Sequence, residues 1–401
     1  MPPGALRLWP ISLAFLALVA ADAVGTSFLP VHARGLAVLW PGLGPAAAAS
    51  LPVACFWLAV AAAQLTVPRW LPEREHDGLM RAALSAVSLA LAASAVAPWA
   101  ELLIVCRMVA GFGYGVAMIL AQDTLLRAYP ASARTQASAF YLSLFFGGSV
   151  SGTVAGGLLA SAIGAGPTLA VGAGLAAVAL VPVAWMPSFR EARRPPGKLA
   201  PLLRNPGFIG LVSLAAIPSR LLIGAFLYYL LPLYLHDQGV GSGQAGWVLM
   251  VYGVTLAALA TPLGRMIDRR GQPFTFTLLG LIGSGVALAA LLLGGGGIGA
   301  AVTAVALLGL AQALGMAPQV TLLFAATQRE MAQAGRARLL GLFRVGERLG
   351  LFLGPLLAGG LLPWAGYAGT LQALTIFILL AAGAFAAVYA ASRKPAVETE
   401  A

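Results

Sequence analysis

The sequence is poor in charge and in the residues that build most catalytic and metal centres. Only 9% of its 401 residues are charged, whereas soluble domains average about 25%. It has two cysteines and three histidines, too few for a disulfide framework or a cysteine-based metal site. No nucleophile–base set, P-loop or metal-binding cluster is evident. We therefore expect neither an enzyme nor a protein that carries a cofactor or a resident metal.

Apolar residues take the place of the missing charges. They make up 60% of the chain, and the mean hydropathy is +0.90. Apolar runs continue for about 20 residues, as membrane helices do, whereas the strands of a membrane β-barrel would alternate apolar and polar residues. We predict an all-α polytopic membrane protein with twelve spans, at residues 8–29, 46–67, 79–98, 102–125, 137–163, 168–187, 208–235, 246–264, 274–293, 299–325, 338–362 and 367–391.

The first run also has features of a signal peptide, because Ala21-Asp22-Ala23 resembles a cleavage site. Eleven further runs favour an uncleaved membrane helix. The spans divide into two bundles of six, residues 1–187 and 208–401, which a basic loop at 188–207 joins. The second bundle ends in a short tail.

Basic residues are distributed unequally between the two sides of the predicted membrane. Of the 24 lysines and arginines, nineteen fall in loops on the side of the two termini, and Arg34 alone lies on the other side. The positive-inside rule then predicts cytoplasmic termini. The net charge of +11 comes from basic residues that lie between the apolar runs and not on one face. We therefore expect a lipid bilayer and no nucleic acid as partner. We expect a monomer in a bacterial inner membrane.

Two matches indicate that the second half repeats the first. Leu29-Pro30 recurs as Leu231-Pro232, 202 residues later. The pentamer at 155–159 recurs identically at 358–362, 203 residues later. Each match joins corresponding spans of the two halves, as expected of a duplicated bundle.

Three motifs point to a family. They are Arg107-x3-Gly111-x-Gly113 in span 4, Gly264-x3-Asp268-Arg269-x-Gly271 after span 8, and Gly148-x3-Gly152-Thr153-x2-Gly156-Gly157 in span 5. With these motifs and its two six-span halves, the chain resembles the major facilitator superfamily of secondary transporters over its whole length. The resemblance implies a central site between halves that rock by alternating access. Thr153 stands where the family's antiporter motif has proline, and residues 68–81 lack the expected Asp-Arg loop.

Charges inside the spans are the strongest pointers to function. A charge at mid-bilayer costs about 2.5–3.5 kcal/mol unless it is paired or faces water. Asp22 and Arg107 lie at similar depths, ~10 and ~8 Å from the same surface, and we predict that they pair. Such a pair could also serve only to lock two helices together. Glu347 lies beside Arg344 and Arg348 and can reach only one of them well at a time, which leaves one positive charge over.

The remaining candidates fall into cavity and gate residues. Helical spacing places the predicted cavity residues on common faces of spans 4, 7 and 10: Arg107, Tyr114, Met118, Gln122, Arg220, Tyr228, Gln312 and Gln319. The two glutamines of span 10 are equally consistent with hydrogen bonds between helices. Gate candidates on the basic side are Asp123, Asp268, Arg269, Arg344 and Arg348. Arg344 could instead extend to the membrane surface, whereas Asp268 is expected to face residues 135–138 when that side is closed.

The leading hypothesis is proton-coupled efflux of a small organic solute, with Asp22 or Glu347 carrying the proton. An alternative is uptake, by symport or facilitated diffusion, of a polar or anionic solute that Arg107 and Arg220 hold. A third possibility is a membrane receptor that keeps the fold but transports nothing.

Overall fold

The computed structural model describes residues 8–70, 75–129, 134–186 and 201–393. Within these ranges the chain is almost entirely helical and forms no strand. The first half contains α1 (Trp9–Ala23), α2 (Leu29–Arg34), α3 (Pro45–Trp70), α4 (His76–Ala95), α5 (Ala100–Ala128), α6 (Arg134–Ile163), α7 (Ala165–Val178) and α8 (Leu180–Val183). Most of the predicted loop at 188–207 lies outside the described residues.

The second half begins with a 3-10 turn and a segment in which α- and π-helix alternate. These elements are η4 (Leu202–Arg204), α9 (Pro206–Leu211), η5 (Val212–Ala216), α10 (Ile217–Leu222), η6 (Ile223–Leu230) and α11 (Leu231–Asp237). The rest of the half is formed by α12 (Ser242–Arg270), α13 (Pro273–Leu293), α14 (Gly297–Ala326), α15 (Gln328–Ala334) and α16 (Arg336–Arg393).

The helices account for the twelve predicted membrane spans. Ten described segments are long and apolar enough to cross a membrane. The last of them, in α16, is two helices that meet at Gly366, whose φ of 61° is left-handed. The apolar helix α1 is shorter, with 15 residues, and α2 follows it after a turn. The predicted polytopic all-α fold is confirmed, and the predicted spans differ from the observed helices mainly at their ends.

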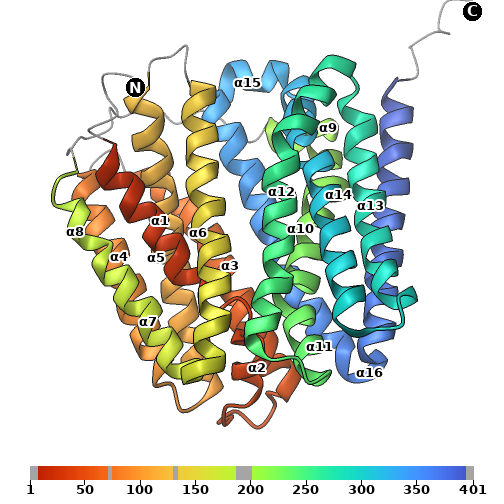
Figure 1. Cartoon of the computed structure of the whole chain (residues 1–401). Coiled ribbons are helices and arrows are strands. Elements are labelled where there is room, and N and C mark those ends of the chain that lie inside the picture. Colours follow the sequence, from red (N-terminus) through yellow and green to blue (C-terminus); the bar gives the residue numbers. More distant parts are fainter. Residues whose placement is uncertain (1–7, 71–74, 130–133, 187–200, 394–401) are drawn as a thin grey trace, which may run out of the picture.

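The two halves stand side by side (Figure 1). The helix α1 begins and α16 ends on the face that carries α15, which we call the terminal face; α2 and α11 lie on the opposite, far face. Between the halves, α3 packs on α16 and α6 packs on α12. Glycines bring backbones together across this boundary near the starts of α12 and α3, toward the far face, at Gly157 with Ser242 and at Gly359 with Ser50. The halves therefore meet most closely on that face.

Glycines of span 5 and span 11 support the predicted repeat in three dimensions. A Cβ at Gly152 would overlap the backbone carbonyl of Ala20, and one at Gly354 would overlap the carbonyl of Leu221. The two glycines are 202 residues apart and their two contacts 201, nearly the offset of the sequence matches. Small residues allow membrane helices to approach at the backbone. In each half the fifth span is thus held against the first in the same way.

Candidate functional site

Two adjoining cavities lie between the halves. The larger has a volume of about 1030 Å³ and the smaller about 610 Å³, open space included. They share the lining residues Thr26, Trp57, Phe145, Ser149 and Tyr228. Four of these come from the first half and Tyr228 from η6 in the second. Both halves therefore build the space, as expected for a site between two bundles.

The smaller cavity contains the predicted ion pair of the first half. Arg107 on α5 donates to Asp22 on α1 at 2.8 Å, and both side chains are largely buried. The guanidinium of Arg107 also lies 4.4 Å from the ring centroid of Phe56. The expected contact thus forms, and Arg107 has a carboxylate and an aromatic face as neighbours. The pair joins two helices and lines a cavity, so both roles considered from the sequence remain compatible with its position.

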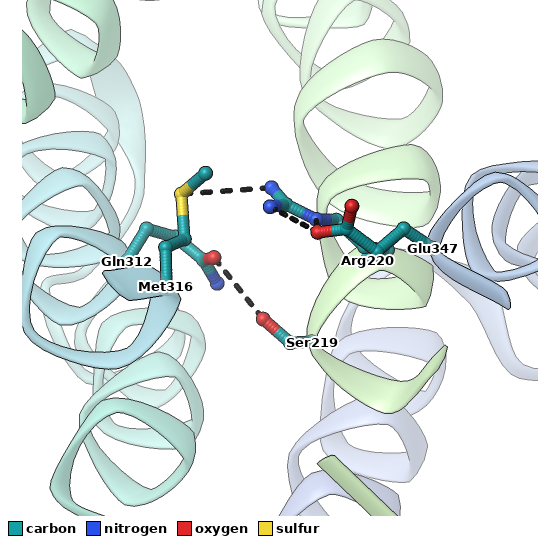
Figure 2. Close-up of polar contacts among 5 residues, drawn as sticks. All are labelled: Ser219, Arg220, Gln312, Met316 and Glu347. Atoms are coloured by element: carbon teal, nitrogen blue, oxygen red, sulfur yellow. Dashed lines mark hydrogen bonds and ion pairs between the residues drawn. The ribbon is translucent and has the colours of Figure 1, made fainter. Parts of the chain in front are cut away.

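The larger cavity contains a second ion pair, between Arg220 on α10 and Glu347 on α16. Arg220 donates to one carboxylate oxygen through Nε at 2.9 Å and through Nη2 at 2.6 Å. Figure 2 shows Arg220 between Glu347 and Met316, whose sulfur lies 3.6 Å from Nη1. The expectation that Glu347 pairs with an arginine of its own helix is wrong. The backbones of the two helices approach closely at Gly350, which brings Arg220 within reach of the carboxylate.

Arg344 and Arg348 line the same cavity without such a partner. In the described part of the chain, no carboxylate oxygen lies within 4.0 Å of either guanidinium. Arg348 lies over Trp57 of the other half, 5.0 Å from the ring centroid, and its Nε is buried with no hydrogen-bond partner. A cation over a tryptophan ring gains about 0.5–2 kcal/mol, less than the cost of an uncompensated buried charge. Two positive charges remain over, where the sequence predicted one.

Aromatic side chains make up much of the cavity wall. Tyr228 stacks on Trp57 across the boundary between the halves, with centroids 6.0 Å apart. Of the predicted residues, Tyr114 lines the smaller cavity and Met118 the larger. Trp57 was not among the predicted site residues, although it is the one tryptophan of eight that does not lie near a predicted span end. That exception was the feature of the sequence that could have identified Trp57 as a site residue.

The glutamines occupy positions away from the cavity lining. Gln312 accepts a hydrogen bond from Ser219 at 3.1 Å, seen in Figure 2, and donates to Ser284 at 3.2 Å. It therefore links three helices, as the structural interpretation of this residue predicted. Gln319 is buried and Gln122 half-buried. Neither they nor Gln312 is among the residues that line the two cavities described here.

The carboxylates among the gate candidates, Asp123 and Asp268, have no ion pair with the other half in the part of the chain that the structure describes. Asp123 accepts from Arg127, one turn along α5, at 2.6 Å and lies 3.6 Å from His76 on α4. It does not pair with Arg344 or Arg348, because the close contacts between the halves lie toward the other face. Asp268 and Arg269 are exposed near the end of α12. The contact predicted for Asp268 requires a closed terminal face and stays a prediction.

On the far face, a polar contact joins the halves directly. Arg34, the last residue of α2, makes a two-pronged ion pair with Asp237 of α11, at 2.5 and 3.0 Å. Tyr367 of α16 donates to the same carboxylate at 2.6 Å. We call these three residues the far-face latch. The sequence identified Arg34 only as the single basic residue of that side and gave no reason to choose its partners, since residues 203 positions apart meet only in the folded bundle.

Comparison with known proteins agrees with this architecture. The sequence model of the Major Facilitator Superfamily matches residues 11–228 and 212–401. A stretch of 170 residues, 41% of the chain, is 29% identical to an uncharacterised MFS-type transporter of Yersinia pestis (strain Pestoides F). A similar protein of Yersinia pseudotuberculosis serotype O:3 (strain YPIII) is 28% identical over 169 residues. The chain covers 43% of the length of each of these relatives.

Solved structures match over nearly the whole chain. A bacterial homologue of the human lysosomal transporter Spinster, in an inward-facing and unoccupied conformation, superposes with a TM-score of 0.74 over 99% of this chain and 100% of that one, at 17% identity. The human organic anion transporter MFSD10 gives a TM-score of 0.64 over 96% and 100%, at 16% identity. These identities show a shared fold. With twelve spans in two repeated halves and a family match across both, the chain belongs to the Major Facilitator Superfamily.

Proposed function

We propose that the protein exports a small organic solute in exchange for protons, by alternating access of the cavity to the two sides of the membrane. The observation that carries this proposal is the cavity between the halves, in which both ion pairs lie. Residues of both halves line this space, and it contains charged, aromatic and apolar side chains, as sites for organic solutes do. Rocking of the halves about this space would expose it to each side in turn.

The proposed orientation places the terminal face in the cytoplasm of a bacterium. Nineteen of the 24 basic residues belong to loops of that side, and basic loops remain cytoplasmic. The close contacts between the halves and the latch then lie on the periplasmic side. In this orientation the structure corresponds to an inward-facing state, ready to take a solute from the cell.

We assign the coupling of protons to this movement to two carboxylates. Asp22 and Glu347 line the cavities, and each holds an arginine from another helix. Protonation would neutralise the carboxylate and leave its arginine without a counter-charge, which costs several kcal/mol in a buried site. The arginine would then favour a different partner or a wetter position. A proton could thus change the arrangement of the helices that each pair joins.

The test is transport by purified protein in proteoliposomes. A thermal-shift screen of metabolites and drugs first selects a solute, because binding to the folded state raises apparent stability. Its flux is then measured with and without a pH gradient. We expect Asp22→Asn to abolish flux driven by the gradient while exchange at equal pH survives, with Glu347→Gln as the parallel variant.

A matched control replaces a carboxylate outside the cavity. Asp77 pairs with Arg81 one turn along α4, so Asp77→Asn makes the same chemical change without touching either cavity pair. We expect it to transport like the wild type. Unchanged gradient-driven flux in Asp22→Asn would remove Asp22 from the proton path, and the same result in Glu347→Gln would remove both candidates.

The alternatives predict different fluxes. In symport of a polar or anionic solute, the pH gradient would drive flux in the opposite direction. In facilitated diffusion, flux would not depend on the pH gradient. Arg107 and Arg220, the residues assigned to hold that solute, are each engaged by a carboxylate, so a solute would have to displace Asp22 or Glu347. A receptor would bind the solute and give no flux.

A further inference from the structure

We infer that the central cavity binds an organic anion with an apolar or aromatic body, and that Arg348 is the residue that holds its charged group. The inference names the solute class of the proposed transporter and rests on that proposal only for movement across the membrane. Binding itself can be tested without transport.

The charges that line the two cavities do not balance. Their arginines are Arg107, Arg220, Arg344 and Arg348, and their carboxylates are Asp22 and Glu347. Each carboxylate is already in an ion pair. An entering cation would therefore meet two uncompensated positive charges and no free carboxylate among these residues, whereas an entering anion would meet two unused partners. The balance of charge thus selects for an anion.

Arg348 is the better placed of the two unused arginines. It lies one helical turn farther along α16 than Arg344, and so deeper from the terminal face. Its guanidinium lies over Trp57 of the other half, and its Nε is buried without a hydrogen-bond partner. A carboxylate, sulfonate or phosphate group beside Arg348 would supply the missing hydrogen-bond acceptor and the counter-charge. A guanidinium presents donors that match two oxygens of such a group at once. Arg344 lies near enough to add a second positive charge.

The aromatic and apolar side chains of the cavity wall indicate the nature of the uncharged part of the ligand. The larger cavity is lined by six aromatic side chains, Trp57, Tyr141, Phe145, Phe146, Tyr228 and Tyr252. Three methionines add flexible apolar surface, and Glu347 is the only carboxylate of its lining. A small hydrated ion would leave this surface unused, whereas a ring or alkyl chain attached to the anionic group would cover it. The cavity is thus matched to an amphipathic anion.

The experiment compares probes that share a body or a charge. Full-length protein in detergent is titrated by calorimetry with naphthalene-2-sulfonate, with naphthalen-2-ylmethylammonium, which has the same rings and the opposite charge, and with inorganic sulfate. We expect the sulfonate to bind at least tenfold more tightly than the ammonium ion or sulfate. The ammonium ion binding as tightly as the sulfonate would overturn the assignment of charge. Sulfate binding as tightly would overturn the assignment of an apolar body.

Variants then test Arg348. We expect Arg348→Gln to weaken sulfonate binding at least tenfold, and Arg348→Lys to restore part of it, since lysine keeps the charge but not the two-pronged geometry. Arg265, exposed near the end of α12, provides a control, because Arg265→Gln changes net charge equally and should leave affinity unchanged. Melting curves establish that each variant is folded. Unchanged affinity in folded Arg348→Gln, or equal loss in Arg265→Gln, would overturn the role of Arg348.

Failure of this inference and failure of the proposed function give different results. If the sulfonate binds through Arg348 but does not cross proteoliposome membranes under any gradient, the anion site stands and transport of this ligand is refuted. If flux of a cationic solute is driven by protons and Arg348→Gln leaves it unchanged, proton-coupled transport stands and the anion site is refuted.

Discussion

The far-face latch should bias the protein toward the conformation that is closed on that side. Its ion pair is about one-third exposed, with side-chain exposures of 29% for Arg34 and 35% for Asp237. Exposed pairs contribute about 0.2–1 kcal/mol, and this one has two-pronged geometry and a third hydrogen bond from Tyr367. We therefore estimate about 1 kcal/mol. A free-energy change of 1.4 kcal/mol alters an equilibrium ratio tenfold. Loss of about 1 kcal/mol in Arg34→Gln should therefore raise the ratio of molecules with an open far face to molecules with a closed one about fivefold.

The opening can be followed with two spin labels on the far face. Val96 and Leu293 end helices of different halves and are highly exposed, at 78% and 86%, so labels there should not disturb packing. Both native cysteines, Cys55 and Cys106, are first replaced by alanine. Pulsed distance measurements in lipid nanodiscs then give the populations. Salt of about 1 M should reduce the difference between wild type and Arg34→Gln, because it screens exposed charges.

A matched control separates the latch from a general loss of charge. Arg81 and Asp77 form an exposed ion pair within α4 on the terminal side, so Arg81→Gln removes one charge without affecting a contact between the halves. We expect its distance distribution to match the wild type. If Arg34→Gln also matches the wild type at low salt, the latch makes no contribution to the conformational balance, and backbone packing alone closes the far face.

Two further predictions concern packing and the opposite gate. Gly156→Ala should lower the thermal midpoint in detergent, because its Cβ would overlap the carbonyl of Val24 and overpacking typically costs about 1–3 kcal/mol. Gly174→Ala is the control, since Gly174 has open space around it. Equal midpoints in the two variants would contradict the close approach at Gly156. Asp268→Asn should favour the conformation open on the terminal face, since it removes the anion expected to face the positive end of α6. That shift would be measured as faster labelling of a cysteine at Gln122 in the cysteine-free background, and equal labelling would exclude Asp268 from that gate.

The fold could be predicted because its main determinants are local. A run of about 20 apolar residues forms a membrane helix whatever its neighbours are, since lipid leaves the backbone no other hydrogen-bond partners. Twelve such runs therefore fix the helices to within a few residues. The kink at Gly366 and the π-helical turns around Arg220 are departures from regular geometry. They depend on packing against other helices, and no periodicity of the sequence reports them.

The ion pairs of the site were predictable only where depth alone determines the contact. Asp22 and Arg107 share a depth on neighbouring helices, and they pair. Glu347 has two arginines on its own helix and one across a glycine-lined contact, and only the packing at Gly350 decides in favour of Arg220. The latch joins helices of different halves, α2 with α11 and α16, which neither span length nor helical spacing brings together. Contacts that depend on how helices pack, within a half or between the halves, thus marked the limit of prediction.

The glycine contacts that hold each fifth span against its first span also reveal what the duplication did not copy. At the offset of 202 residues, Asp22 corresponds to Gly224 and Glu347 corresponds to Phe145. The two halves therefore share a backbone scaffold, whereas their carboxylates occupy unrelated places on it. A solute between the halves would meet a carboxylate at a different place on each of its two sides. The cavity should therefore favour one orientation of an asymmetric molecule, although the framework around it is close to symmetric.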